Sequence, residues 1–188
     1  SSVTGVQTCA LPISISGAGS FSQLGTGTTT LSGNNSFSGG VSLNAGVLNL
    51  GSSGAIGSSG TISLGGGVLQ YSASNTTDYS DRFSTAANQA YNIDTNGQNV
   101  SYASALTSTG GTLTKLGSGT LTLAGANSYT GGTTINAGAL TVTGTLGTGT
   151  YAGAISVGSG ANFSMNSASN QNLSGTISGA RSEEHTSE

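Results

Sequence analysis

The sequence predicts an all-β protein: a right-handed, single-stranded parallel β-helix, or solenoid, that is incomplete and uncapped at both ends. Three observations predict this fold. Gly, Ser, Thr and Asn make up more than half of the chain, a long stretch is duplicated, and short segments alternate apolar with small polar residues.

The composition permits only a thin hydrophobic core. Aliphatic residues recur at close intervals, but Pro and Trp are almost absent and charged residues make up 5% of the chain. A solenoid suits this composition because each coil buries a few apolar side chains against its neighbours. With 3 basic residues in 188 there is no basic patch, so nucleic acid is not an expected partner. No apolar run is long enough to span a membrane and no signal peptide opens the chain, so we expect no direct membrane insertion of this segment.

The two ends differ in composition from the rest of the chain. Residues 181–188 read RSEEHTSE, and residues 6–14 read VQTCALPIS. If the former is written with the codons AGA TCG GAA GAG CAC ACG TCT GAA, its reverse complement encodes residues 7–13 in a shifted frame. We therefore interpret residues 1–14 and 181–188 as translated sequencing-adapter DNA, and residues 15–180 as the natural segment.

This interpretation removes several chemically reactive residues from the argument. Cys9, Pro12 and His185 are the single residues of their types, and all three fall in the terminal segments. No thiol nucleophile and no histidine base then remain.

A long duplication organises the natural segment. Residues 19–50 align with residues 111–142 without a gap at an offset of 92, and 16 of the 32 aligned positions are identical. A spacer occupies about residues 71–106. Beyond the two units, Thr61–Gly65 still resembles Ala154–Gly158, so nearly two long periods are present.

Within each unit a period of two predicts short strands with one buried face, for example over residues 120–123 and 140–142. We expect turns at residues 125–127, 131–132 and 136–138, where Gly and Asn tolerate positive φ. The separation of Leu121 from Leu140, and that of Leu31 from Leu48, are each close to one coil of a three-sided β-helix. The residues predicted to point inward are Leu31, Leu43, Leu48, Leu50, Leu121, Leu123, Ile135, Leu140, Val142, Ile155 and Val157; those predicted to point outward are Thr120, Thr122, Thr134 and Thr141. A two-sheet sandwich would share these strands, but it explains the duplication less naturally.

No catalytic, cofactor-binding or metal-binding residues are assigned, no cofactor is expected, and the segment is not expected to be an enzyme. Asp78, Asp81, Arg82 and Asp94 fall in the block that interrupts the repeat, and paired carboxylates there could act as acid and nucleophile on a polysaccharide. A solvated loop or a local pair is the favoured interpretation, because no other base is nearby. An Asn-Gly turn is preferred to a calcium loop at Asp94–Gly97.

Three further patterns have structural interpretations. The glycines at 65–67 and 117–119 lack the following helix of a phosphate-binding loop and are assigned to coil corners. Lys115, which aligns with Gln23, is expected to be a solvated charge at a strand edge. Tyr129 and Phe37 occupy equivalent positions and are expected to stack between coils. The remaining tyrosines could line a carbohydrate-contacting face, a less favoured interpretation of Tyr71, Tyr79, Tyr91 and Tyr102.

Residues 113–142, LTKLGSGTLTLAGANSYTGGTTINAGALTV, resemble the passenger-associated repeat of autotransporters, with its Lys, alternating Thr-Leu, Asn-x-Tyr-x-Gly-Gly-Thr and terminal Gly-x-Leu. Residues 21–50 resemble a second copy, which departs from the pattern at Gln23 and Phe37. Residues 78–106 resemble the spacer between such repeats.

The resemblance implies a β-helical passenger on the surface of a Gram-negative bacterium, or secreted, exported through the type V route by a covalently linked C-terminal β-barrel translocator. It implies a structural stalk whose repeats assist secretion and folding. The alternatives are an adhesin segment that binds host or biofilm glycans and, less favoured, a polysaccharide-acting enzyme.

Overall fold

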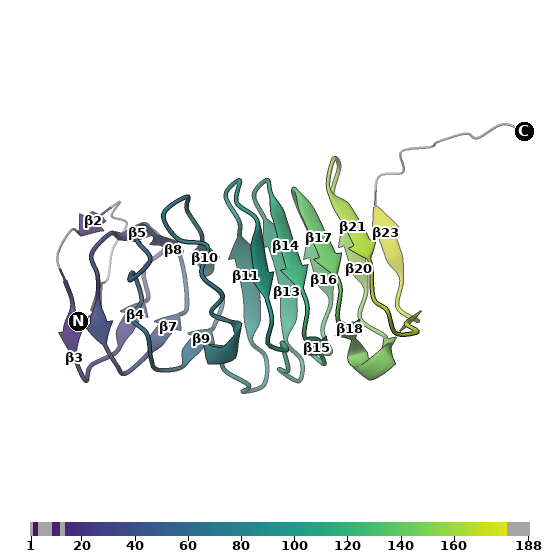
Figure 1. The fold of residues 1–188 in the computed structure, drawn as a ribbon, viewed down its shortest axis with the longest axis horizontal. Coiled ribbons are helices and arrows are strands. Elements are labelled where there is room, and N and C mark those ends of the chain that lie inside the picture. Colours follow the sequence, from purple (N-terminus) through teal and green to yellow (C-terminus); the bar gives the residue numbers. More distant parts are fainter. Residues whose placement is uncertain (1, 4–8, 12–13, 180–188) are drawn as a thin grey trace, which may run out of the picture.

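The computed structural model describes residues 2–3, 9–11 and 14–179, and shows a stack of coils along one long axis (Figure 1). Residues 181–188 and most of residues 1–14 lie outside the described part. The interpretation of both ends as adapter-derived therefore stays a prediction.

One sheet runs along the whole stack. Its nine strands are all parallel, and each belongs to the next coil. They are β2 (Cys9–Leu11), β5 (Thr28–Leu31), β8 (Val47–Leu50), β10 (Val68–Gln70), β11 (Ala90–Asp94), β13 (Thr112–Leu116), β16 (Thr133–Ile135), β20 (Ile155–Val157) and β23 (Ile177–Gly179).

Shorter parallel sheets form the other sides of the coils. One four-stranded sheet contains β1 (Ser2–Val3), β4 (Phe21–Gln23), β7 (Val41–Leu43) and β9 (Ile62–Leu64); the other contains β12 (Val100–Tyr102), β14 (Thr120–Leu123), β17 (Ala139–Val142) and β21 (Asn162–Met165). Three strand pairs complete the set: β3 (Ser16–Gly17) with β6 (Ser36–Phe37), β15 (Ala126–Asn127) with β18 (Thr145–Leu146), and β19 (Thr150–Tyr151) with β22 (Asn172–Leu173). The predicted parallel β-helix is confirmed.

Two short 3₁₀ turns, η1 (Ser80–Arg82) and η2 (Gly147–Gly149), interrupt the described coils. Neither these nor any other helix among the described residues has the length and apolar character that a membrane-spanning helix requires.

Strand register fixes the length of a coil. Leu121 pairs with Leu140 of the next coil, so the spacing predicted from these two residues is confirmed. The shorter spacing from Leu31 to Leu48 is wrong as a measure of one coil, because Leu31 pairs with Leu50 and Leu48 pairs with Thr29. Both of these pairs have the same spacing as Leu121 and Leu140. Leu31 and Leu48 belong to two neighbouring interior columns. Such columns lie side by side because residues two positions apart in one strand point to the same face.

The predicted alternation of buried and exposed side chains is confirmed at nearly every position. All the residues expected inside are buried except Val157, which is half-buried near the C-terminal coil. The four threonines expected outside are half-exposed. Stacking therefore converts a period of two within each strand into continuous apolar columns along the axis.

Glycine at one coil corner is required by close backbone contact. Gly46 and Gly138 occupy equivalent positions in the two repeats, with φ of 64° and 66°. A Cβ atom would lie 2.3 Å from the carbonyl oxygen of the preceding coil at either position. The expected turn at residues 136–138 is thus confirmed, whereas the expectation of positive φ at residues 125–127 and 131–132 is wrong: 126–127 form strand β15, and none of these residues has a positive φ.

The two copies of the duplication lie on different sides of the β-helix. In the first copy, β5 and β8 belong to the nine-stranded sheet, whereas the equivalent strands of the second copy, β14 and β17, belong to the sheet with β12 and β21. Conversely, β4 lies in a short sheet and its equivalent β13 lies in the long one. The repeat therefore specifies a local sequence of strands and corners, and not a fixed side of the solenoid.

Replacing Leu140 with Ala should destabilise the protein by about 2–5 kcal/mol, because it leaves a cavity in a fully buried column. The matched control is Thr141→Ala on the outer face of the same strand, where a change within about 0.5 kcal/mol is expected. Urea unfolding followed by circular dichroism measures both. Equal effects of the two substitutions would contradict the register.

Candidate functional site

The two repeats share a buried asparagine that joins three successive parts of the coil stack. Asn127 is fully buried; its Oδ1 accepts a hydrogen bond from the Leu106 amide of the preceding coil at 3.0 Å. Its Nδ2 donates to the Thr145 carbonyl of the following coil at 3.2 Å and to the Gly125 carbonyl at 2.8 Å. One side chain thereby satisfies backbone groups of both neighbouring coils.

Asn35 makes the same connections in the first repeat. Its Oδ1 accepts from the Ile15 amide of the preceding coil, and its Nδ2 donates to the Ala55 carbonyl of the following coil. We call Asn35 and Asn127 the asparagine clamps. Sequence reasoning missed them, although their identity in both copies at an inward-facing position was an available signal.

A second polar clamp lies at a coil corner, and it corrects the expectation for Lys115. The side chain of Lys115 is fully buried, not solvated at a strand edge. Its Nζ donates to the carbonyls of Leu116, Gly117 and Ala137, at 2.8, 2.7 and 3.2 Å. The period of two places Lys115 on the inward face of β13, where its length lets the ammonium reach the corner carbonyls. We call this arrangement the corner clamp.

Gln23 makes equivalent contacts in the first repeat. Its Nε2 donates to the carbonyls of Gly25 and Gly27, and its Oε1 accepts from the Thr29 hydroxyl. Gly25 aligns with Gly117, so the amide and the ammonium hold the same corner carbonyl. Burial lowers the pKa of Lys115 to about 8, and the charge of Asp94 opposes this shift only in part.

The tyrosines considered for a carbohydrate-contacting face lie inside the coil stack. Tyr71, Tyr79, Tyr91 and Tyr102 are at most 4% exposed, which overturns that possibility. The large rings fill the wider coils of the spacer, where Leu69 pairs with Ile93, a longer spacing than that between Leu121 and Leu140. Burial raises the pKa of Tyr71 and Tyr102 above the ordinary value, and their hydroxyls lie 3.1 Å apart.

Stacking of Tyr129 between coils is confirmed. Its ring centroid lies 6.3 Å from that of Tyr91 and 5.5 Å from that of Tyr151, both in edge-on arrangements. The Tyr129 hydroxyl contacts the Thr133 hydroxyl at 2.7 Å, which in turn contacts the Tyr151 hydroxyl at 2.8 Å. The equivalent Phe37 is buried and lies near Phe21. These aromatic contacts add to the packing of the columns.

The fold places the charged residues of the spacer in two separate locations. Asp78, Asp81 and Arg82 line one shallow pocket, but Asp94 does not belong to it. Arg82 donates to the carbonyls of Ile56, Gly57, Ser59 and Gly60, and its guanidinium lies 5.6 Å from the Tyr79 ring centroid.

The carboxylates of this block also have structural contacts. Asp78 accepts from the amides of Ser80 and Ala103. On the long sheet, Asp94 accepts from Gln70 Nε2, and Gln70 accepts from Asn49. Arg82 and Asp78 therefore bond to backbone groups, and Asp94 bonds to a side chain of the neighbouring strand. Among the described residues, no group of three or more His, Cys, Asp or Glu could hold a metal ion.

The glycine motifs lie at corners as expected. Asn96 and Gly97 both have positive φ, and the Gln98 amide donates to the Thr95 carbonyl, so an Asn-Gly turn is confirmed. Gly66, Gly117 and Gly119 also have positive φ.

Two segments of the chain match a known protein family, and both contain the clamps. Residues 21–50 and 113–142 match the family described as passenger-associated-transport-repeat. We call these two matching segments the transport repeats. Each transport repeat contains one asparagine clamp and one corner clamp, at Asn35 and Gln23 in the first and at Asn127 and Lys115 in the second.

A curated relative is the adhesin BmaC autotransporter of Brucella suis biovar 1 (strain 1330), which is 38% identical over 132 residues. The alignment covers 62% of this chain and 4% of the relative, so the chain spans a small part of that protein. No solved structure matches the chain. The transport repeats and the relative agree with the resemblance to autotransporter passengers.

The stability of the protein should rise between about pH 8 and about pH 9.5. Lys115 loses its proton near pH 8 in the folded state but near 10.5 in the unfolded chain, so over this interval the unfolded chain binds more protons. The interval stays below the usual range of tyrosine. Urea unfolding midpoints across this range measure the rise.

Lys115→Gln is the matched control, because it places the residue of the first transport repeat in the second. Its midpoint should lack this component of the pH dependence. The same rise in both proteins would exclude Lys115 as its cause.

Asn127→Asp should destabilise the protein by about 2 kcal/mol or more, because the donor to Gly125 and Thr145 is lost and a carboxylate faces their carbonyls. Asn99 is the control: it is exposed and its Oδ1 accepts from the Thr120 amide, so Asn99→Asp keeps the acceptor. Thermal unfolding of both variants measures the difference. A clamp role is wrong if Asn127→Asp is as stable as Asn99→Asp.

Proposed function

We propose that this segment is a structural stalk of an autotransporter passenger, and that its transport repeats assist secretion by folding into clamped coils outside the cell. The asparagine clamp carries the proposal, because each one joins a coil to both of its neighbours. Addition of a coil then satisfies buried polar groups as well as burying apolar surface.

Export would use a C-terminal β-barrel translocator covalently linked in the full-length protein. The relative supports this partner, because it is named an autotransporter. The coils of the spacer separate the two transport repeats. During export, the two sets of clamps would therefore form one after the other as the chain emerges.

An enzymatic role is not proposed. Arg82 and Asp78 are engaged with backbone groups, and Asp94 stands apart from the pocket that the other charged residues line. Asp78 and Asp81 line one pocket, but Asp78 is held by two backbone amides, so we propose no acid–base pair there.

Adhesion is the second candidate function. It is favoured by the name of the relative, an adhesin. Binding of residues 15–179 to an array of host and biofilm glycans would support it, whereas no binding on the array would leave the stalk role alone.

The stalk proposal predicts that Asn35→Asp with Asn127→Asp, introduced into the full-length protein, lowers surface display several-fold at unchanged synthesis. Slower folding of the emerging coils would reduce the pull on the chain that remains inside. Surface labelling of intact cells against total protein measures this effect, with Asn99→Asp as the control. Unchanged display of a double variant whose isolated segment is clearly destabilised would contradict the proposal.

A further inference from the structure

The last described coil presents apolar side chains at the C-terminal end of the stack (Figure 1). Its strands β21, β22 and β23 continue the interior columns of the coils before it. Ile177 pairs with Ile155, which is 1% exposed, but Ile177 itself is 54% exposed. Phe163 and Leu173 also belong to interior columns, and both are half-buried. We call the surface formed by Phe163, Leu173 and Ile177 the end face.

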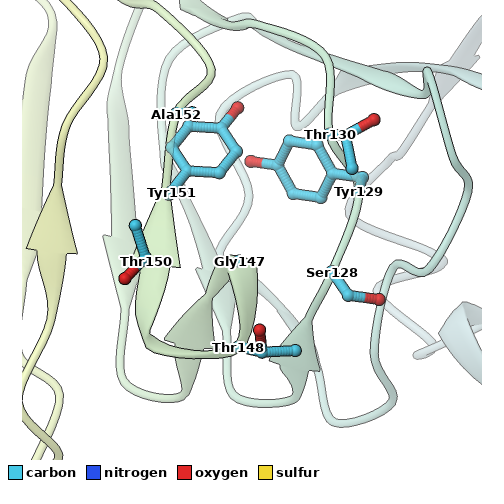
Figure 2. Close-up of a pocket in the computed structure, with 8 residues that line it drawn as sticks. All are labelled: Ser128, Tyr129, Thr130, Gly147, Thr148, Thr150, Tyr151 and Ala152. Carbon is cyan, nitrogen blue, oxygen red and sulfur yellow. The ribbon is translucent and has the colours of Figure 1, made fainter.

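The end face has the character of a contact between coils. In Figure 2 the rings of Tyr129 and Tyr151, from successive coils, lie side by side, and both are buried because coils lie on either side of them. Leu173 pairs with Tyr151 and continues this packing by one coil. A further coil on Leu173 would bury it in the same way.

The edge of the end face has a short sequence that occurs at one other place in the chain. Residues 177–180 read ISGA, and so do residues 15–18, which lead into the first transport repeat. Both isoleucines pack towards the core, Ile15 against buried residues and Ile177 in the column of Ile155. The first of the two segments therefore shows which part of the chain docks on such a sequence.

The clamp region of the first transport repeat docks on residues 15–17. The Ile15 amide donates to Asn35 Oδ1 at 2.7 Å, and the Ile15 carbonyl accepts from the Ser36 amide at 2.8 Å. The Gly17 carbonyl accepts from the Ser38 amide at 3.0 Å. This segment is thus paired, one coil later, by the asparagine clamp and the two residues that surround Phe37 in the transport repeat.

Strand β23 offers the same backbone groups at the end face. The Ile155 amide donates to the Thr176 carbonyl, and successive residues of a parallel strand bond to opposite neighbours. The amide and carbonyl of Ile177 therefore point away from β20, towards the open side of the stack. An asparagine clamp 20 residues later would accept from the Ile177 amide as Asn35 accepts from Ile15.

The apolar side chains agree with the same spacing. In the first transport repeat, Phe21 and Leu31 are buried in the core. A repeat that follows residue 180 as the first follows residue 18 places the counterparts of Phe21 and Leu31 20 residues after Phe163 and Leu173, the spacing that separates Ile15 from Asn35. Each counterpart would then cover one half-buried member of the end face.

We propose that the end face is a docking surface for a further transport repeat of the same polypeptide, which enters through Ile177–Gly179. One coil of such a repeat covers the apolar side chains and pairs the backbone groups of Ile177. The proposal goes beyond the stalk role, because it assigns a particular partner to one end of the segment and does not depend on secretion. A second copy of the chain, stacked end to end, is the competing occupant.

The test extends the chain after residue 180 with a copy of residues 19–50, in place of residues 181–188. Native-state hydrogen exchange of the Ile177 amide is compared with and without this copy. We expect exchange to slow by about ten-fold or more, because the copied asparagine accepts from the amide and a coil covers it. The urea m-value should rise roughly in proportion to the residues added.

Two changes within the copy are matched controls. Leu31→Asp puts a charge on its inward face and should leave Ile177 at the rate of the unextended protein. Asn35→Ala removes the acceptor and should restore faster exchange at Ile177. The Leu106 amide, which lies inside the stack, reports whether each chain has folded. A copy of residues 111–142 is the second extension, to be used if the first does not fold.

Exchange at Ile177 that is no slower with either extension than without it would overturn the proposal. Equal slowing by the copy that carries Leu31→Asp would overturn it as well. If the unextended protein already protects Ile177, and more so at higher protein concentration, a second copy is the occupant and the assignment to a transport repeat is wrong. None of these results bears on surface display, which tests the stalk role separately.

Discussion

The structure depends on the stacking of successive coils in register. Every parallel strand pair joins residues of two successive coils, so backbone amides and carbonyls find partners only if the neighbouring coil has the matching shape. The apolar columns follow from this register, because a strand shifted by one residue would turn its leucines outward. The close approach of Gly46 and Gly138 to the preceding coil follows from it as well.

At the corners of the coils, backbone amides and carbonyls lie outside the strands, and regular strand pairing does not supply partners for all of them. The buried side chains of Asn35, Asn127, Gln23 and Lys115 meet this need. The same corner tolerates an amide in one transport repeat and an ammonium in the other, because both reach the carbonyl at residue 25 or 117. What the repeats share is therefore a pattern of donors and not one particular side chain.

Much of this fold could be predicted from the sequence, because the period of two and the duplication are both local signals. The inward position of Leu121, Leu140 and Ile155 followed directly from them. The side of the solenoid on which each copy lies could not be predicted, since it depends on the summed lengths of the spacer coils. Sequence reasoning misplaced Lys115 because it assigns charged side chains to the surface, whereas Lys115 pairs with Ile93 and Ile135 and its ammonium reaches carbonyls inside. A surface position of the spacer tyrosines was a less favoured possibility, and their burial excludes it.

The claim that buried side chains join the coils is tested most directly by native-state hydrogen exchange of the wild-type protein. The amides of Leu106 and Leu64 donate to the side chains of Asn127 and Gln89 at 3.0 and 2.8 Å, whereas the Thr120 amide donates to the exposed Asn99. We predict that Leu106 and Leu64 exchange as slowly as the central strand amides, through opening of whole coils, and that Thr120 exchanges faster. Rapid exchange at Leu106 and Leu64, at the rate of exposed loops, would contradict the account.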